Sequence, residues 1–264
     1  MEYPEIVEID SVKDEADGIK TIFFKYKLNA KPGQFVMVWI PRMDAKPMGI
    51  GYLAGDKFGV TVAERGPFTK KLCEMKPGEK VGIFGPYGNT YNLEVESIAL
   101  VGGGYGVASL AVLAEHALKE KIGVSFIIGA RTKSKLVYIK RLKEIGIIPM
   151  IMTDDGSAGE RGTAVNALAK LLAGKRIDKV YSCGPEKMLI KVAELCREKK
   201  VKCELNTERW FKCGFGICGH CVVDPLGIRL CVEGPTLDRE TFLKVTEFGK
   251  YERMKSSRKD YFGQ

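Results

Sequence analysis

The stretch that decides the fold is Val101-Gly-Gly-Gly-Tyr-Gly-Val-Ala108, which follows an apolar run and opens a helical pattern, Val107 to Lys121. Glycines at such a junction let the backbone approach a pyrophosphate at the N-terminus of the helix. The spacing is not the common G-x-G-x-x-G fingerprint, so a tight turn without a ligand is the alternative. The pattern predicts a nucleotide-binding turn.

Apolar runs alternate with helical stretches on both sides of this turn. The runs are Ile98 to Val101, Val124 to Ile128, Pro149 to Met152 and Lys179 to Ser182, and the further helices are Thr163 to Ala173 and Pro185 to Glu198. Strands that alternate with helices indicate an α/β fold with a doubly wound parallel sheet.

Three more motifs follow strands of this sheet: Gly129-Ala-Arg-Thr132, Thr153-Asp-Asp-Gly-Ser157 and Cys183-Gly-Pro185. Open parallel sheets bind ligands beyond the carboxyl ends of their strands, so we expect all three to face one crevice. An inert buried cysteine is the alternative for Cys183.

The first part of the chain has a different texture. From Pro4 to about Leu93, short alternating segments are broken by Pro-Gly pairs at 32–33 and 77–78. These strand and turn signals predict a small antiparallel β-barrel. Within it, Lys46-Pro-Met-Gly49 and Arg65-Gly-Pro-Phe-Thr69 offer a cation, a hydroxyl and backbone amides to an anionic cofactor. Ordinary turns are the alternative for each motif.

Four cysteines near the C-terminus, Cys213, Cys218, Cys221 and Cys231, stand as C-x4-C-x2-C-x9-C. This is the opening of the plant-type [2Fe–2S] spacing, and Gly214 and Gly216 suit a loop that donates N–H groups to cluster sulfurs. Structural zinc, which usually takes two close C-x2-C pairs, and unligated thiols are the alternatives. His220 is expected to be a polar residue at the rim, because a Rieske centre needs two histidine ligands.

Composition narrows the class of protein. The chain has 264 residues with 45% hydrophobic content, enough for two domains and a small module. Its net charge of +9 comes from scattered Lys and Arg, so we expect no nucleic-acid partner. Glycines interrupt the longest uncharged run, so we expect no membrane span. Eight cysteines without a leader-like segment suggest a reducing cytoplasm.

These patterns predict four units: a β-barrel domain at 1–96, an α/β nucleotide-binding domain at 97–205, a [2Fe–2S] module at 206–235 and a basic tail at 236–264. Charged terminal segments are usually solvated, but we expect this tail to dock an acidic partner surface.

In order, Pro32-Gly-Gln-Phe35, Lys46 to Gly49, Gly66 to Thr69, Gly85-Pro-Tyr-Gly88, the glycine turn and Cys183-Gly-Pro185 resemble the ferredoxin–NADP reductase superfamily. The match covers residues 4–205. Glu208 to Cys221, with Cys231-Val-Glu-Gly-Pro235, resembles the cluster module of one branch, the electron-transfer subunits of class B dihydroorotate dehydrogenase. Glu247-Phe-Gly-Lys-Tyr251 is similar to archaeal members of that branch.

The resemblance implies FAD, a [2Fe–2S] cluster and NAD(H) as cofactors. Around FAD it places Lys46, Pro47, Met48, Gly49, Thr61, Val62, Ala63, Gly66, Pro67, Phe68 and Thr69. Facing NAD(H) it places Gly102, Gly103, Gly104, Gly106, Cys183, Gly184 and Pro185. The cluster ligands would be Cys213, Cys218, Cys221 and Cys231, and no acid–base residue is implied.

Two departures from the family pattern concern the first flavin motif, which usually reads Arg-Pro-x-Ser or Thr. Lys46 replaces a bidentate arginine with a point charge, and Gly49 removes a hydroxyl near the reactive flavin nitrogen. NADH is implied as the nucleotide, although Arg131, Lys133 and Lys135 are candidates to meet a 2′-phosphate.

The implied function is electron transfer between NAD⁺ and a separate, FMN-containing dihydroorotate dehydrogenase subunit, in a heterotetramer that serves pyrimidine biosynthesis. Three alternatives stay open: a diaphorase subunit of a hydrogenase or ferredoxin-dependent transhydrogenase, a free-standing NAD(P)H reductase, and a non-enzymatic adaptor with a structural metal. Cys213 weighs against transhydrogenases whose first cluster ligand is aspartate.

Overall fold

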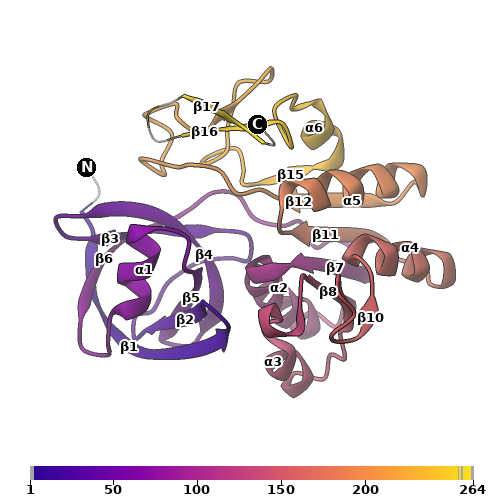
Figure 1. Cartoon of the computed structure of the whole chain (residues 1–264), viewed down its shortest axis with the longest axis horizontal. Coiled ribbons are helices and arrows are strands. Elements are labelled where there is room, and N and C mark those ends of the chain that lie inside the picture. Colours follow the sequence, from indigo (N-terminus) through magenta and orange to yellow (C-terminus); the bar gives the residue numbers. More distant parts are fainter. Residues whose placement is uncertain (1–2, 255, 257, 263–264) are drawn as a thin grey trace.

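The computed structural model describes residues 3–254, 256 and 258–262, so the predicted domain limits at 1 and 264 lie outside the described residues. In Figure 1 a barrel made by the first part of the chain stands beside a sheet with helices on both faces. The last part of the chain lies above both of them. This arrangement confirms the predicted fold class.

The barrel is closed by six antiparallel strands in the order β1-β2-β5-β4-β3-β6. Valine, isoleucine and phenylalanine side chains fill it, and the rings of Phe24 and Phe58 stack with their centroids 4.9 Å apart. Helix α1 (Pro67–Glu74) follows β5. The strands are β1 (Glu5–Ala16), β2 (Ile19–Phe24), β3 (Phe35–Ile40), β4 (Asp44–Ala54), β5 (Lys57–Ala63) and β6 (Lys80–Tyr87).

Strand β3 is apolar along its whole length because both of its faces are covered. Val36 and Val38 point into the barrel core, whereas Phe35 and Met37 belong to the core shared with the C-terminal part of the chain. Successive side chains of a strand point to opposite faces, so an uninterrupted apolar run implies two buried faces. The barrel and the cysteine module are therefore packed together through β3.

A seven-stranded sheet forms the second domain, in the order β10-β9-β8-β7-β11-β12-β15. All pairs are parallel except the last, in which β15 runs antiparallel to β12. The strands are β7 (Ser97–Gly103), β8 (Gly123–Ala130), β9 (Met150–Thr153), β10 (Glu160–Arg161), β11 (Lys179–Cys183), β12 (Lys202–Asn206) and β15 (Thr236–Asp238).

Helices cover both faces of this sheet, because apolar side chains of β7 point alternately to one face and the other. Ile98 and Leu100 face the core beneath α2 and α3, and Ala99 and Val101 face the core beneath α4, α5 and α6. The helices are α2 (Val107–Lys119), α3 (Ile139–Glu144), α4 (Ala164–Gly174), α5 (Glu186–Glu198) and α6 (Arg239–Lys244), with short 3₁₀ turns η1 (Gly104–Gly106) and η2 (Lys133–Lys135). No helix among the described residues is long and apolar enough to cross a membrane.

The cysteine module leaves the sheet after β12 and contains two short strands, β13 (Val222–Val223) and β14 (Ile228–Arg229). The chain then returns to the sheet as β15 and continues into α6 and the hairpin of β16 (Tyr251–Arg253) and β17 (Lys259–Tyr261). The segment predicted as a basic tail is thus folded onto the rest of the chain for much of its length. The lysines and arginines of this segment did not predict its strands and helix, because charge alone does not indicate backbone pairing.

Candidate functional site

A cavity of about 480 Å³ opens where the barrel, the sheet domain and the cysteine module meet. Every residue that the resemblance places around FAD lines it, on β4, β5 and the start of α1. Gly106 and Cys183 line it from the nucleotide side, whereas Gly102, Gly103, Gly104, Gly184 and Pro185 do not. Residues 206–211 complete the wall.

The start of α1 carries one of the predicted cofactor motifs, Arg65 to Thr69. Pro67 occupies the first helical turn, where its missing N–H costs nothing, and the first N–H groups of a helix lack partners inside the helix. The Thr69 hydroxyl accepts hydrogen bonds from the backbone N–H groups of Arg65 and Gly66, at 2.8 and 3.0 Å. The Thr69 hydroxyl, which was a candidate contact to an anionic cofactor, therefore hydrogen-bonds to the backbone of the turn itself.

Lys46 stands on the opposite wall and is already engaged. Its ammonium lies 3.0 Å from an Asp44 carboxylate oxygen and 4.2 Å from the centre of the Trp210 ring. An ammonium over an aromatic face is stabilised by about 0.5–2 kcal/mol. The contact ties the flavin motif of the barrel to the segment that leads into the cysteine module, so Lys46 has a second role beside charge.

The glycine turn and Cys183-Gly-Pro185 touch each other at the ends of the neighbouring strands β7 and β11. A Cβ on Gly106 would lie 2.6 Å from the Cys183 carbonyl oxygen, and one on Gly184 would lie 2.9 Å from Gly103 Cα. Only glycine allows these backbones to come so close. The ends of β8 and β9 belong to the same row of parallel strands, which places the predicted motifs at one edge of the sheet.

Cys183 contributes a neutral thiol to this crevice. Burial raises the pKa of Cys183 to about 12, so the group stays protonated at neutral pH. Its sulfur lies 3.9 Å from the Asn206 side-chain oxygen, at the end of β12. The thiol is therefore an uncharged part of the cavity lining.

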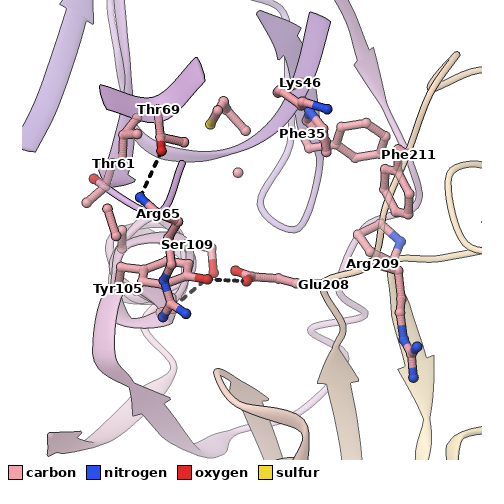
Figure 2. Close-up of a pocket in the computed structure, with 18 of the residues that line it drawn as sticks. Phe35, Lys46, Thr61, Arg65, Thr69, Tyr105, Ser109, Glu208, Arg209 and Phe211 are labelled. Atoms are coloured by element: carbon pink, nitrogen blue, oxygen red, sulfur yellow. Dashed lines mark hydrogen bonds between the residues drawn. The ribbon is translucent and has the colours of Figure 1, made fainter. Parts of the chain in front are cut away.

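Figure 2 shows a pair that the sequence did not reveal, Tyr105 and Glu208, with the Arg65 guanidinium over the tyrosine ring. The Tyr105 hydroxyl donates a 2.7 Å hydrogen bond to the Glu208 carboxylate. Burial raises the pKa of Glu208, and the neighbouring Glu208 charge raises that of Tyr105. Glu208 lies just beyond the end of β12. If β12 had been predicted as a strand, the expectation that ligands bind beyond strand ends would have indicated Glu208.

The four cysteines lie in two pairs. The sulfurs of Cys221 and Cys231 are 3.2 Å apart, and the Cys218 thiol hydrogen-bonds to Cys213. Among the residues that the structure describes, no three cysteine, histidine or acidic side chains surround a single point. Two pairs suit a cluster of two irons, each of which takes two thiolates.

The lowered pKa values of two of these thiols, Cys213 and Cys221, fit ligation as thiolates. Burial acts to raise the pKa of Cys213, but N–H groups of Cys218, Phe215 and Ile217 outweigh it and lower the pKa to about 7. The hydrogen bond between Cys221 and Cys231 lowers the pKa of Cys221 to about 7 and raises that of Cys231. Backbone amides directed at sulfur are the surroundings that iron–sulfur clusters need.

Glycines shape this loop against its neighbours. Gly214 and Gly216 have positive φ angles of 85° and 87°. A Cβ on Gly214 would lie 2.8 Å from Met37 Cγ on β3, and one on Gly216 would lie 2.7 Å from Val232. The cysteine loop is thereby held directly on the outer face of the barrel strand.

Arg209 joins the module to the sheet domain. Its guanidinium is buried and lies 2.7 Å from Glu186, the first residue of α5, and 3.8 Å from Glu247. It also donates a 2.6 Å hydrogen bond to the Tyr251 carbonyl. Charges buried in this way are stable only when paired. One side chain therefore connects the cavity wall, the nucleotide side and the C-terminal segment.

Comparisons with known proteins decide the family. The chain is 37% identical to the probable dihydroorotate dehydrogenase B (NAD(+)), electron transfer subunit, of Methanocaldococcus jannaschii, and the match covers 99% of this chain and 100% of that protein. It is 39% identical to the protein of the same name from Pyrococcus horikoshii, over 96% of each chain. The chain belongs to the dihydroorotate dehydrogenase B electron transfer subunit family. The resemblance seen in the motifs is thereby confirmed.

Further matches agree with this family. A family model described as the iron-sulfur cluster binding domain of dihydroorotate dehydrogenase B matches residues 208–243. The solved structure of an NADH-dependent reduced ferredoxin–NADP oxidoreductase has a TM-score of 0.82 and 27% identity, and the match covers 94% of this chain and 95% of that one. A phthalate dioxygenase reductase, at 15% identity and a TM-score of 0.61 over 73% of this chain and 64% of its own, shares the fold.

Proposed function

We propose that this family member transfers electrons between NAD(H) and a partner dihydroorotate dehydrogenase subunit, through FAD and a [2Fe–2S] cluster. The observation that carries the proposal is the contact between the cysteine loop and the cavity. Phe211 lines the cavity two residues before Cys213, and its ring lies 4.9 Å from that of Phe35 on β3. A cluster on this loop would sit within a few residues of a flavin in the cavity.

Each cofactor has residues that fit it. The first turn of α1 and Lys46 would hold the FAD pyrophosphate, and Thr61 to Ala63 would line the flavin. The two cysteine pairs would hold the cluster, and the crevice beside Gly106 and Cys183 would hold the nicotinamide nucleotide. When bound, FAD would exchange single electrons with the cluster and a hydride with NAD⁺. The chain's own task is to position these groups and exclude water from between them.

The partner subunit would dock over the cysteine loop. Cys218 is exposed, and around it lie apolar side chains that are open to solvent, Phe215 at 50%, Ile217 at 80% and Val232 at 41%. Exposed apolar groups at one place indicate an interaction surface. We propose an FMN-containing catalytic subunit there, in a heterotetramer that makes orotate for pyrimidine synthesis in the cytoplasm.

A second candidate is a subunit of a ferredoxin-dependent transhydrogenase, favoured by the nearly full-length likeness to the ferredoxin–NADP oxidoreductase structure. The same cavity and loop would serve it, with a different partner on the exposed face. Copurification with the genome-encoded dihydroorotate dehydrogenase catalytic subunit separates the two, because only the first proposal requires a stable complex that reduces NAD⁺ with dihydroorotate.

The test of the cofactors is an anaerobic visible spectrum of the purified chain before and after NADH, with iron, acid-labile sulfide and flavin assayed on the same sample. We expect flavin and iron–sulfur bands that both bleach with NADH. Zinc without flavin would refute the oxidoreductase function, and flavin without iron would refute the role given to the cysteines.

A further inference from the structure

Tyr138 closes the joint between the barrel and the sheet domain, behind the cavity. It precedes α3 in a left-handed conformation, with φ of 65°, and is 4% exposed. Its hydroxyl lies 2.6 Å from the hydroxyl of Thr61 on β5 and 3.1 Å from that of Thr21 on β2, and it donates to the Gly51 carbonyl on β4 at 3.2 Å. One hydroxyl of the sheet domain thus binds three barrel strands.

The joint is packed so closely that it admits no side chain at residue 51. A Cβ there would lie 2.7 Å from the Thr61 hydroxyl, 3.0 Å from the Tyr138 hydroxyl and 3.1 Å from Ala108 Cβ. Thr61 lines the cavity on the flavin side, and Ala108 lines it from the first turn of α2, just after the glycine turn. The flavin wall and the nucleotide wall therefore meet at Gly51.

Arg141 on α3 makes a second link to the same point. Its guanidinium donates a hydrogen bond to the Gly51 carbonyl and another, of 2.8 Å, to Glu115 on α2. It also lies over the rings of Tyr52 and Tyr138, at 4.8 and 5.0 Å from their centres. Burial raises the pKa of Tyr138, so its hydroxyl remains a donor at neutral pH.

We propose that Tyr138 is a positioning residue that sets the gap between the flavin and the nicotinamide, by fixing Thr61 and Gly51 of the barrel against α2 of the sheet domain. The inference rests on the proposed function, because it concerns hydride transfer across the cavity. Tyr138 does not line the cavity, so it acts through Thr61 and Gly51. A misplacement near 1 Å can slow such a step about 100-fold.

The test is Tyr138→Phe in the full chain with its FAD and cluster, followed by anaerobic stopped-flow reduction with NADH. The variant keeps the ring over Arg141 and loses only the hydroxyl. We expect the limiting rate of flavin bleaching to fall by about tenfold or more, with FAD and iron content unchanged and the half-saturating NADH concentration within about twofold. Hydrogen–deuterium exchange should quicken in β4 and the first turn of α2 and stay constant in β1 and β6.

Tyr181→Phe is the matched control, since the buried Tyr181 hydroxyl donates to the Asn92 carbonyl away from the joint. It should lose comparable thermal stability and keep the wild-type rate. Thr21→Val removes the β2 hydroxyl that contacts the Tyr138 hydroxyl, and Thr21 does not line the cavity. We expect this variant to show a smaller fall in the rate of flavin bleaching. A Tyr138→Phe protein with wild-type rate and exchange, or equal slowing in Tyr181→Phe, would overturn the proposal. If NADH does not reduce the flavin of the wild-type protein, the proposed function is refuted instead. The hydrogen–deuterium exchange measurement still tests the role of Tyr138 in the joint.

Discussion

Gly106→Ala should impair the reaction with NADH and leave FAD and the iron–sulfur cluster bound. The new Cβ would stand 2.6 Å from the Cys183 carbonyl oxygen and 2.9 Å from the Gly184 nitrogen, and both are backbone atoms that cannot rotate away. The two motifs must part by about 0.8 Å to restore the 3.4 Å of ordinary contact. Overpacking of this kind costs about 1–3 kcal/mol.

Two measurements follow from that displacement. The melting temperature should fall by about 2–4 °C for each kcal/mol lost, and the rate of flavin reduction by NADH should fall about 10- to 100-fold. Flavin and iron content should not change, because neither motif holds them. Gly174→Ala is the control, since a Cβ there meets nothing within 4 Å. A wild-type melting temperature and a wild-type rate of flavin reduction in Gly106→Ala would refute the steric reasoning.

Two other changes are informative. Lys46→Arg should tighten FAD binding by up to about tenfold in a fluorescence titration, because a guanidinium can contact a phosphate through two N–H groups; unchanged or weaker binding would mean that the contact with Trp210 is the main role of Lys46. Glu208→Gln should alter the pH dependence of unfolding. Because burial raises the pKa of Glu208 above 4.5, the wild type should lose stability as pH rises from 4.5 through that raised value, and the amide variant should lack this loss and be more stable at pH 7. Melting curves between pH 5 and 8 that run parallel for the two proteins would contradict this.

The sequence predicts those strands, helices and cluster cysteines that a local pattern determines. The strand-turn-helix at 101–108 is such a case, because glycine content and apolar runs report backbone geometry directly. Strand β3 lies in the part of the chain that was predicted to form a β-barrel, but its second buried face depends on Phe211, which is distant in sequence. No periodicity carries that information.

The features that sequence missed depend on distant partners. Strand β15 has only three residues and is recognisable only beside β12. Tyr138 meets Thr61 across 77 positions, and Tyr105 meets Glu208 across 103. A tyrosine before a short helix has no local signature of a domain joint. Tertiary packing alone gives these side chains their roles.

The pairing of Asn206 with Thr236 has a consequence for how such proteins are assembled. The polypeptide enters the cysteine module from β12 and leaves it into β15, so both ends of this insert are hydrogen-bonded neighbours in one sheet. The entropic cost of closing such an insert grows only slowly with its length, by about 0.6 kcal/mol for each doubling. The module can therefore change in length between these two strands without disturbing the sheet, whereas its contacts with Phe35 and Lys46 keep it attached to the cavity wall.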